Sequence, residues 1–321
     1  MTGTIQSIVE AIRGGRTVLI TSHEGPDGDA IGSSLGLAAF LSAIGKKVTV
    51  HLADQVPELY RFLPGADQVH QTIPDQDFDL GFVLDVGEFR RAGKQFCSFT
   101  RIGTLINIDH HLTCENFGVF NLIDEQAAAT GLLIWRIAKA YGFTADYATA
   151  LCLYVAVLTD TGSFRYSNSN REAFATAGEL VEQGGLNAWH VAEKLYESQP
   201  RKRIELLAQA LPTLEFVKGG QVASITVSLP MYAATGTSAE LTDGFVNYPR
   251  SVAGVEVAIF FRQLEEKKYK VGFRSKGTVN VAALAQAFGG GGHHNAAGGT
   301  VEGNLDEVKK IVYGAVEAAQ W

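Results

Sequence analysis

Short apolar segments that alternate with helical patterns constrain the fold of the first half of this chain more than any other feature. Strand-like runs cover residues 17–21, 47–52, 80–84 and 104–108, and helical patterns cover 28–44, 130–142 and 146–158. Continuous apolar runs of this length, each followed by polar residues, are typical of parallel strands buried on both faces. The alternation predicts a doubly wound, mostly parallel α/β sheet, in which ligands bind beyond the carboxyl ends of the strands.

The second half of the chain has a different pattern. Residues 187–212 are helical and charged, and Pro200 should interrupt them, so we place a helical linker there. A smaller mixed α/β domain is predicted by a strand at 221–228, a hairpin through 255–263 and 269–274, and helices at 281–288 and 305–319. At about 100 to 200 residues per domain, 321 residues suit two domains, which we place at 1–186 and 213–321.

The charge of the chain excludes one class of partner and favours another. The net charge is −7, from 27 Lys+Arg and 34 Asp+Glu, which does not suit the binding of long duplex DNA. Residues 1–186 carry 13 basic and 21 acidic side chains, a net −8, whereas residues 187–321 carry 14 and 13, a net +1. An acidic first half suits metal cations, and a neutral second half can supply cations to an anionic substrate.

Neither a membrane span nor a secretion signal is predicted. No window approaches 18 uncharged apolar residues, and the start MTGTIQSIVEAIRGGR lacks the basic residues and apolar run of a secretory signal. We therefore expect a cytoplasmic protein without a membrane partner. The sequence allows a homodimer but does not determine the oligomeric state.

Acidic and histidine side chains follow three strand-like runs and one helix. They are His23, Asp27 and Asp29 after the first run, Asp85 after the third, Asp109, His110 and His111 after the fourth, and Asp160 after the helix. Taken alone, Asp27 or Asp29 also fits a helix cap in a Pro-Asp-Gly turn. Acids from four positions at one sheet edge would repel one another unless cations lay among them. Carboxylate and imidazole ligands suit manganese or a similar divalent ion, so we predict a metal site there.

The same residues resemble the four motifs of the DHH phosphoesterase superfamily. The matching elements are His23-x-x-x-Asp27-x-Asp29, Asp85, Asp109-His110-His111 and Asp160. The segment Gly289-Gly290-Gly291-Gly292-His293-x-x-Ala296-Ala297-Gly298 resembles the glycine-rich signature of the DHH-associated C-terminal domain. The length of the chain and the run DTGSFR from Asp160 resemble the compact branch of bifunctional oligoribonucleases and pAp phosphatases, where pAp is adenosine 3',5'-bisphosphate.

The resemblance implies a two-metal centre in the first domain. One manganese would be held by His23, Asp27 and Asp85, and the other by Asp29, Asp85, His110 and Asp160, so that Asp85 bridges both. Two cations about 3.5 to 4 Å apart acidify a shared water and stabilise the attacking and leaving oxygens, and magnesium or cobalt could replace manganese. Asp109 would orient a neighbouring group, and His111 would face the scissile phosphate as an electrostatic stabiliser or leaving-group acid.

A second group of residues is expected to bind the substrate, mainly in the C-terminal domain. By resemblance, the run of Gly290, Gly291, Gly292 and His293 binds a phosphate through its backbone N–H groups, although such a run also fits a flexible tip. Arg262 and Arg274 lie on the two arms of the predicted hairpin and could clamp a phosphate, with Arg274 and Ser275 the better candidates. Arg262 fits a surface salt bridge equally well. Arg165 and His294 are further candidates, with loop packing and solvent exposure as the alternatives, and His51, His70 and His190 are expected to be structural.

The expected activity is that of a manganese-dependent phosphoesterase. It would degrade RNA of about two to five nucleotides to mononucleotides, because an acidic protein offers longer chains few further contacts. It would also remove the 3'-phosphate of pAp to give AMP. Two alternatives stay open. The first is hydrolysis of cyclic di-AMP or pApA, which the same superfamily performs, and the second is a non-catalytic nucleotide-binding module.

Overall fold

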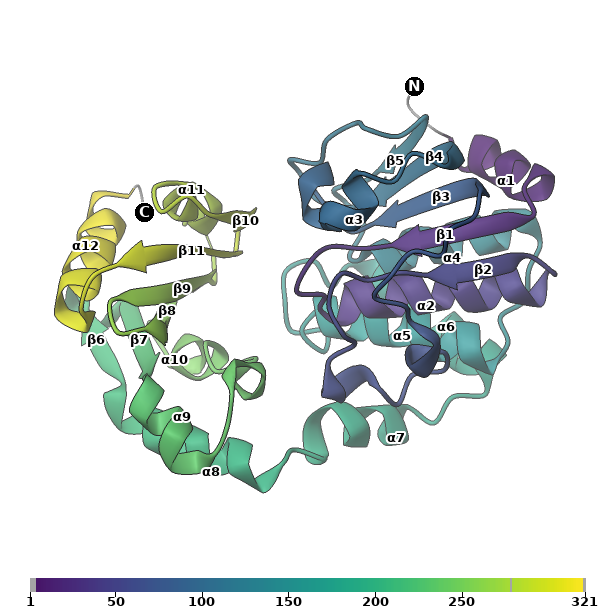
Figure 1. Cartoon of the computed structure of the whole chain (residues 1–321). Coiled ribbons are helices and arrows are strands. Elements are labelled where there is room, and N and C mark those ends of the chain that lie inside the picture. Colours follow the sequence, from purple (N-terminus) through teal and green to yellow (C-terminus); the bar gives the residue numbers. More distant parts are fainter. Residues whose placement is uncertain (1–3, 278, 320–321) are drawn as a thin grey trace. The chain divides into compact units, whose positions relative to one another are not determined.

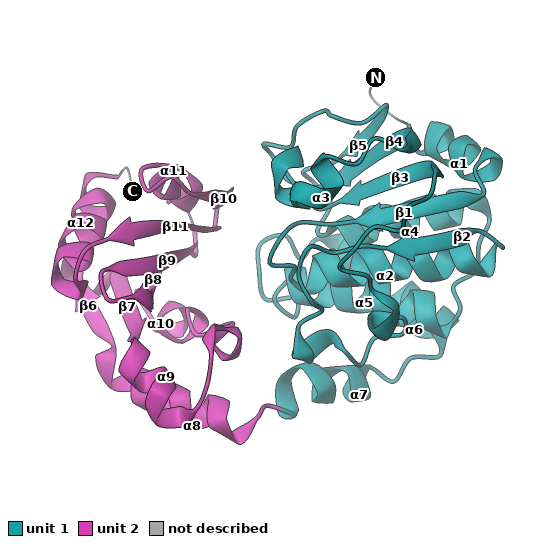
Figure 2. Ribbon diagram, viewed as in Figure 1, with its two compact units in different colours: residues 1–198 teal, residues 199–321 magenta. Residues whose placement is uncertain are grey.

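The computed structural model describes residues 4–277 and 279–319, and its chain divides into two units after Ser198 (Figure 2). The division lies inside the predicted linker. Helix α7 (Ala188–Ala192) continues as a π-helical turn, Glu193–Glu197, in the first unit, and α8 (Arg201–Ala210) begins the second. Pro200 directly precedes α8, where its missing N–H costs no helical hydrogen bond.

Five parallel strands form the sheet of the first unit (Figure 1). Their order is β2 (Lys47–Val50), β1 (Thr17–Thr21), β3 (Phe78–Leu84), β4 (Ile102–Asp109) and β5 (Phe120–Ile123). This 2-1-3-4-5 order is that of a doubly wound sheet, whose chain reverses direction across the sheet between β1 and β3. The predicted fold class is confirmed, and β5 is an additional strand that the sequence did not indicate.

The two faces of this sheet are covered unequally. One face packs against three helices, α1 (Ile5–Gly14), α2 (Gly28–Ala43) and α4 (Thr130–Tyr141). Helices α5 (Tyr147–Asp160) and α6 (Arg171–Gly184) pack against α2 and α4, and all five helices share one large core with the sheet. The other face carries a small cluster around Leu19, Val83 and Phe96, with the short α3 (Lys94–Cys97). Short 3₁₀ turns occupy Glu58–Tyr60, Ala66–Gln68 and Phe89–Ala92.

Helices α2 and α5 approach each other along a stripe of glycines. A Cβ at Gly32 would lie 2.5 Å from the backbone oxygen of Cys152, and a Cβ at Gly36 would lie 2.5 Å from a methyl carbon of Leu153. Gly28 faces Thr159 in the same way, so the two helices run antiparallel. Because glycine has no side chain, α2 and α5 can approach each other closely along this stripe. The start of α2 and the end of α5 therefore meet at one edge of the sheet.

The second unit is a mixed six-stranded sheet with helices on both faces. Its order is β10 (Gly291–His293), β11 (Ala296–Glu302), β9 (Lys268–Ser275), β8 (Val257–Glu265), β7 (Val222–Val227) and β6 (Glu215–Val217). One face packs against α11 (Val281–Gln286) and α12 (Leu305–Ala318), and the other against α8, with α9 (Leu229–Thr235) and α10 (Asn247–Ser251) nearby. Further 3₁₀ turns lie at Leu211–Thr213, Lys218–Gly220 and Ala239–Thr242. The smaller mixed α/β domain is thus confirmed.

None of the helices in the described part of the chain is both long enough and apolar enough to cross a membrane.

Candidate metal centre

The acidic and histidine residues of the first unit gather at the carboxyl edge of its sheet. His23 and Asp27 follow β1, Asp29 lies in the first turn of α2, and Asp85 follows β3. Asp109 ends β4, and Asp160 ends α5. Because β1 and β3 are the strands at which the winding of the sheet reverses, this is the position at which doubly wound sheets bind their ligands.

The first set of side chains consists of His23, Asp27 and Asp85. The Nε2 atom of His23 lies 3.9 Å from Oδ1 of Asp27 and 3.8 Å from Oδ2 of Asp85. Asp27 also caps α2, since its Oδ1 accepts from the backbone N–H groups of Asp29 and Ala30, each at 3.1 Å. Asp27 therefore both caps α2 and belongs to the first set.

The second set consists of Asp29, His110 and Asp160. The Nε2 atom of His110 lies 3.7 Å from a carboxylate oxygen of Asp29 and 3.7 Å from one of Asp160. It also lies 3.5 Å from Oδ1 of Asp85. The two carboxylate oxygens of Asp85 thus approach different sets, Oδ2 toward His23 and Oδ1 toward His110. In each set the potential ligand atoms lie within 4.8 Å of one another.

Both histidines present the same nitrogen to the cluster. The Nδ1 atom of His23 lies 2.9 Å from the carbonyl oxygen of Glu24, and Nδ1 of His110 lies 3.1 Å from that of Ala127. When a neutral ring donates its Nδ1–H to a backbone carbonyl, the lone pair is on Nε2, which here faces the cluster. This is the orientation that metal-binding histidines adopt.

The start of α4 fixes two of the carboxylates, and the sequence analysis did not identify it. The backbone N–H groups of Thr130 and Gly131 donate to the Asp29 carboxylate at 2.6 and 3.0 Å, and the Thr130 hydroxyl donates to Asp85 at 3.2 Å. Asn168 also donates to Asp160, at 3.2 Å. Burial raises the pKa of Asp29, and the start of α4 opposes this rise, because a helix N-terminus favours negative charge. The feature of the sequence that could have indicated this role of α4 is the run of small residues directly before Thr130.

Asp109 holds His111 rather than joining either set. Its Oδ1 accepts from the His111 backbone at 2.8 Å and lies 2.6 Å from Nδ1 of the His111 ring. Its Oδ2 accepts from the Gly87 N–H at 2.6 Å and from the Cys114 thiol at 3.2 Å. These hydrogen bonds hold the pKa of Asp109 well below its usual range, although burial opposes the shift. His111 Nδ1 lies 3.5 Å from Asp85.

The electrostatics of the cluster favour bound cations. Burial raises the pKa of Asp85 well above its ordinary value, and the nearby carboxylates of Asp29 and Asp27 raise it further. Asp85 also has a left-handed backbone, with φ of 60°, which is uncommon outside glycine and clusters at functional sites. Divalent cations would relieve the repulsion, and the oxygen and imidazole donors suit hard or borderline ions. The residues present therefore fit a pair of divalent metal ions.

In the second unit, the candidate arginines lie on one sheet face but not side by side. The register pairs Arg274 with Ala258 and Arg262 with Lys270. Four strand residues thus separate the two arginine positions, about 13 Å along the sheet. Ser275 is buried, and its hydroxyl is hydrogen-bonded to Oδ1 of Asn295 at 2.8 Å. The hairpin turns at residues 266–267 as predicted.

The four-glycine run is partly a strand rather than a flexible tip. Gly291 and Gly292 pair with Gly298 and Ala297 in the β10–β11 hairpin. The N–H of Gly290 donates to Ala285 at 2.9 Å, so it is occupied within the fold. Weak β-propensity concealed this hairpin in the sequence, because glycine and alanine are depleted in strands.

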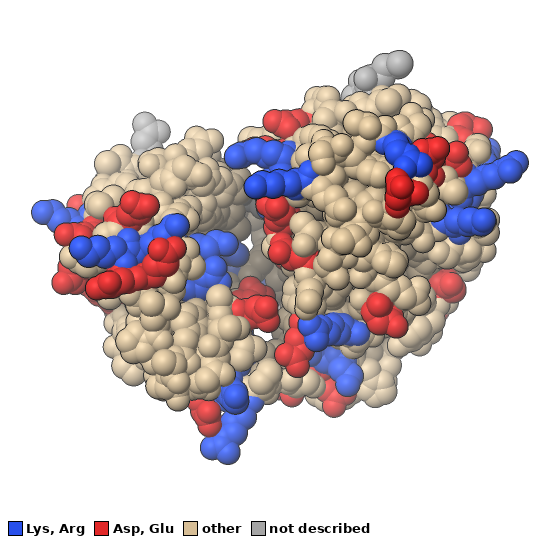
Figure 3. Space-filling model, viewed as in Figure 1, with Lys and Arg blue, Asp and Glu red and all other residues tan. Residues whose placement is uncertain are grey.

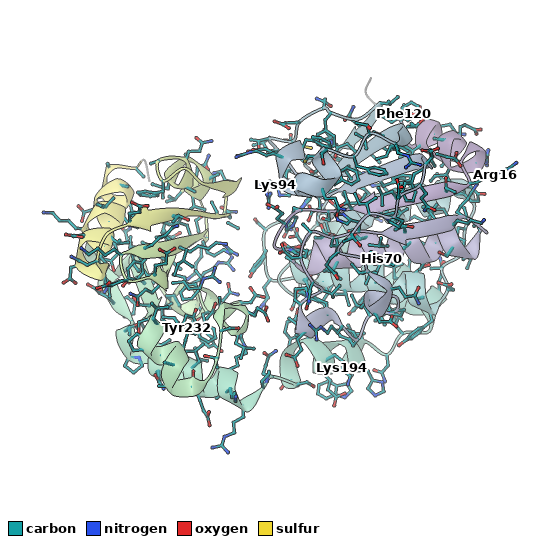
Figure 4. The ribbon with its side chains drawn as sticks, in the orientation of Figure 1. Arg16, His70, Lys94, Phe120, Lys194 and Tyr232 are labelled. Carbon is teal, nitrogen blue, oxygen red and sulfur yellow. The ribbon has the colours of Figure 1, made fainter. Side chains whose placement is uncertain are left out.

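Two of the remaining candidates, Arg165 and His294, are exposed. Arg165 is exposed in the loop after Asp160, where its Nε donates to the Gly162 oxygen at 2.7 Å. His294 is exposed, with Nδ1 2.8 Å from Oδ1 of Asn295. The side chain of His293 lies outside the described residues. His51 is buried and forms a backbone bridge with His70, which Figure 4 labels on the first unit.

Alanine substitutions at two neighbouring glycines are expected to have different effects on stability. A Cβ at Gly290 would collide with the backbone of Gly298 and Gly299, whereas a Cβ at Gly291 meets no atom within 4 Å. We expect Gly290→Ala to lower the free energy of unfolding of the second unit by about 1 to 3 kcal/mol, through overpacking. Gly291→Ala should leave it within about 0.5 kcal/mol. Thermal unfolding of both variants tests this, and equal melting temperatures would contradict the observed hairpin.

The fold and the cluster together define a class of two-domain α/β proteins, in which carboxylates and imidazoles gather at the sheet edge of the first domain and a mixed sheet forms the second. Residues 17–157 match the DHH family, N-terminal domain, and residues 221–318 match the DHHA1 domain. The chain belongs to the DHH family.

Three known proteins are similar to this chain over nearly its whole length. The bifunctional oligoribonuclease and PAP phosphatase NrnA of Thermus thermophilus is 35% identical over 316 residues, which cover 97% of this chain and 92% of that protein. The protein of the same name from Bacillus subtilis is 25% identical over 299 residues, covering 92% of each chain. The crystal structure of an exopolyphosphatase-related protein from Bacteroides fragilis superposes with a TM-score of 0.91 at 29% identity, covering 98% of this chain and 95% of that one.

Proposed function

We propose that this protein is a metal-dependent phosphoesterase that degrades very short oligoribonucleotides to mononucleotides and converts pAp to AMP. The observation that carries the proposal is the pair of ligand sets that share Asp85. The printed names of the Thermus thermophilus and Bacillus subtilis relatives support the two substrates.

Two divalent cations, most suitably manganese, would acidify a shared water and stabilise the attacking and leaving oxygens at phosphorus. His23 and Asp27 would bind one ion, Asp29, His110 and Asp160 the other, and Asp85 both. Magnesium or cobalt would also suit these donors. Thr130 holds the carboxylates of Asp29 and Asp85 in place through the hydrogen bonds described above.

His111 would act on the phosphate itself, and Asp109 would orient it. Asp109 holds the His111 ring through Nδ1, at 2.6 Å, which sets the orientation of the opposite ring nitrogen. His111 would then stabilise the phosphate charge or donate a proton to the leaving oxygen. In the second domain, Arg274, Ser275 and the segment from Gly290 to His293 would hold a substrate phosphate, with Arg262, Arg165 and His294 as further contacts. The catalytic domain would be 1–186, the linker 187–212 and the substrate domain 213–321.

Substrate length provides a direct prediction. The net charge is −7, and on the face drawn in Figure 3 acidic and basic side chains are interspersed in both units. Each added phosphate of a long RNA would therefore find few new cationic partners. We expect kcat/KM for a dinucleotide to exceed that for a 24-mer, roughly tenfold or more. Equal or faster cleavage of the 24-mer would contradict the short-RNA assignment.

The nearest alternative substrate is cyclic di-AMP or its linear product pApA. Steady-state rates on pAp, pApA, cyclic di-AMP and short RNA, with manganese and then with magnesium, separate these substrates. The proposed function expects turnover of both pAp and short RNA. Turnover of cyclic di-AMP alone would replace it, and binding without turnover under all conditions would favour the non-catalytic module.

A further inference from the structure

The side chain of Asn168 reaches back to Asp160, eight residues earlier in the chain. Its amide nitrogen Nδ2 lies 3.2 Å from Oδ2 of the Asp160 carboxylate and 3.1 Å from the Asp160 carbonyl oxygen. The same nitrogen lies 3.0 Å from the carbonyl oxygen of Ala128. One amide group therefore connects the end of α5 with the segment that leads into α4, two helices that pack side by side (Figure 1).

The segment 127–131 also orients the two other members of the second set. The carbonyl oxygen of Ala127 lies 3.1 Å from Nδ1 of His110. The backbone N–H groups at the start of α4 donate to the carboxylate of Asp29. The amide described above thus attaches Asp160 to the segment that already holds His110 and Asp29, so all three ligands of the set are hydrogen-bonded to one piece of backbone or to the side chain anchored on it.

Asp160 has the most exposed side chain of the second set. It is 24% exposed, whereas the side chains of Asp29 and His110 are 1% and 7% exposed. Burial alone therefore does not fix the direction of the Asp160 carboxylate. Groups that hydrogen-bond to a metal-ligating carboxylate orient it and influence the affinity for the metal. Asn168 is such a group.

The loop between Asp160 and Asn168 has an unusual backbone. Ser163 and Phe164 have left-handed φ values of 61° and 58°. In residues other than glycine such conformations cost energy, and they persist where the surrounding structure enforces them. Thr161 gives part of this support, since its hydroxyl accepts from the Phe164 N–H at 3.1 Å and its carbonyl oxygen accepts from the two N–H groups that follow. Asn168 closes the loop at its far end and returns the chain to Asp160.

The amide oxygen of Asn168 indicates that donation is the role of this side chain. Oδ1 is buried and has no hydrogen-bond partner among the described residues. A buried polar atom without a partner is unfavourable, so its presence in a native fold needs an explanation. Exchanging the oxygen and the nitrogen would place the amide oxygen against three other oxygens. The side chain therefore keeps its NH₂ group on Asp160 and Ala128 and leaves its oxygen unsatisfied.

Asn170, two residues further along, provides a comparison within the same loop. Its Nδ2 donates to the carbonyl oxygen of Gln126 at 3.0 Å, and its Oδ1 accepts from the Ala173 N–H at 2.9 Å as the N-cap of α6. Both asparagines thus attach the loop to the residues before α4. In the described structure, Asn168 is the one of the two that also donates to a carboxylate of the second set.

We propose that Asn168 is a positioning residue of the metal centre, which holds the Asp160 carboxylate in the second set and so determines how tightly that set binds its ion. This inference rests on the two-metal centre of the proposed function. The first set, with His23 and Asp27, is built on β1 and the start of α2 rather than on this loop. Loss of Asn168 should therefore weaken one ion and spare the other.

Calorimetric titration of the metal-free full chain with manganese is the main test. The wild type should bind two ions. Asn168→Ala should bind one ion with wild-type affinity and the other about 10- to 100-fold more weakly, as when other groups that orient metal ligands are removed. If Asn168→Ala does not fold, Asn168→Leu serves instead, because it removes the donor and retains most of the volume of the side chain.

Rescue by metal is a second readout. At a manganese concentration that just saturates the wild type, Asn168→Ala should turn over pAp at least about tenfold more slowly. Raising the manganese concentration should restore most of the rate, because weakened binding is overcome by mass action. A general loss of structure would not be reversed in this way.

Asn170→Ala is the matched control. It removes the N-cap of α6 and should lower the melting temperature by about 2 to 4 °C. Both manganese ions should nevertheless bind to Asn170→Ala with wild-type affinity. This variant therefore separates a loop that is less stable from a ligand that is no longer held.

The outcomes separate the two proposals. Folded Asn168→Ala or Asn168→Leu protein that binds both ions like the wild type would overturn the positioning role, and so would equal weakening of both ions or the same weakening by Asn170→Ala. A wild type that bound a single ion would overturn both proposals. If the wild type bound two ions, Asn168→Ala weakened one of them, and neither pAp nor short RNA were hydrolysed with any divalent cation, the proposed function would fail while the role of Asn168 stood.

Discussion

Replacing Asp85 with Asn is expected to lower phosphoesterase activity about a thousandfold or more, because Asp85 is the only described carboxylate that approaches both ligand sets. Asn retains the size of the side chain and tolerates the left-handed backbone of this position. The loss should therefore come from the missing charge rather than from misfolding. The measurement is kcat/KM on pAp with saturating manganese, and activity within about tenfold of the wild type would contradict the two-metal centre.

Although Asp85→Asn should be far less active, it should be at least as stable as the wild type when metal is removed. A carboxyl whose folded pKa is raised lowers the stability of the metal-free protein as pH rises above its unfolded value, 3.8. Asp85→Asn removes that cost, so with a chelator at pH 7 it should melt at or above the wild-type temperature. The advantage should shrink as pH falls toward 4. Asp67→Asn, at an exposed position, is the matched control and should change neither activity nor melting temperature.

Gly32→Ala should lower the free energy of unfolding of the first unit by about 1 to 3 kcal/mol, and by more if the helices cannot separate. The new Cβ would lie 2.5 Å from the Cys152 oxygen and 2.8 Å from the Ala156 nitrogen, both backbone atoms that cannot rotate away. Moving α2 away from α5 would also separate Asp29 from Asp160. Calorimetric binding of manganese should therefore weaken together with the melting temperature.

Gly178→Ala is the matched control for this substitution. Gly178 lies inside α6, and a Cβ there would meet no atom within 4 Å. The exchange should raise stability by about 0.5 to 1 kcal/mol, because alanine is the better helix former. If Gly32→Ala were as stable as Gly178→Ala, the close contact between α2 and α5 would be wrong.

The sequence predicted the central strands well and the marginal ones poorly. Long apolar runs indicated β1, β3 and β4, whose buried positions favour Val, Ile and Leu on both faces. It missed β5, β6 and β10, which have only three or four residues and so leave little periodicity to detect. β11 includes the run Ala-Ala-Gly-Gly, and its strand conformation depends on pairing with β9.

The sequence likewise predicted some residues of the candidate site and missed others. Side chains with metal-ligating chemistry at strand ends could be named in advance, because parallel strands bring their carboxyl ends to one edge. The groups that orient them could not be named, because Thr130 and Gly131 act through backbone N–H groups whose direction depends on where α4 begins. The separation of Arg262 from Arg274 needed the strand register, which a hairpin pattern alone does not fix.

The dispersal of the ligands along the chain has a consequence for synthesis on the ribosome. The first set is complete once residue 85 has been made, but the second set waits for Asp160, at the end of α5. A nascent chain shorter than 160 residues therefore contains the other carboxylates of the site but not Asp160. Ion capture by both sets can only follow the emergence of α5, which would make it a late event in the maturation of this domain.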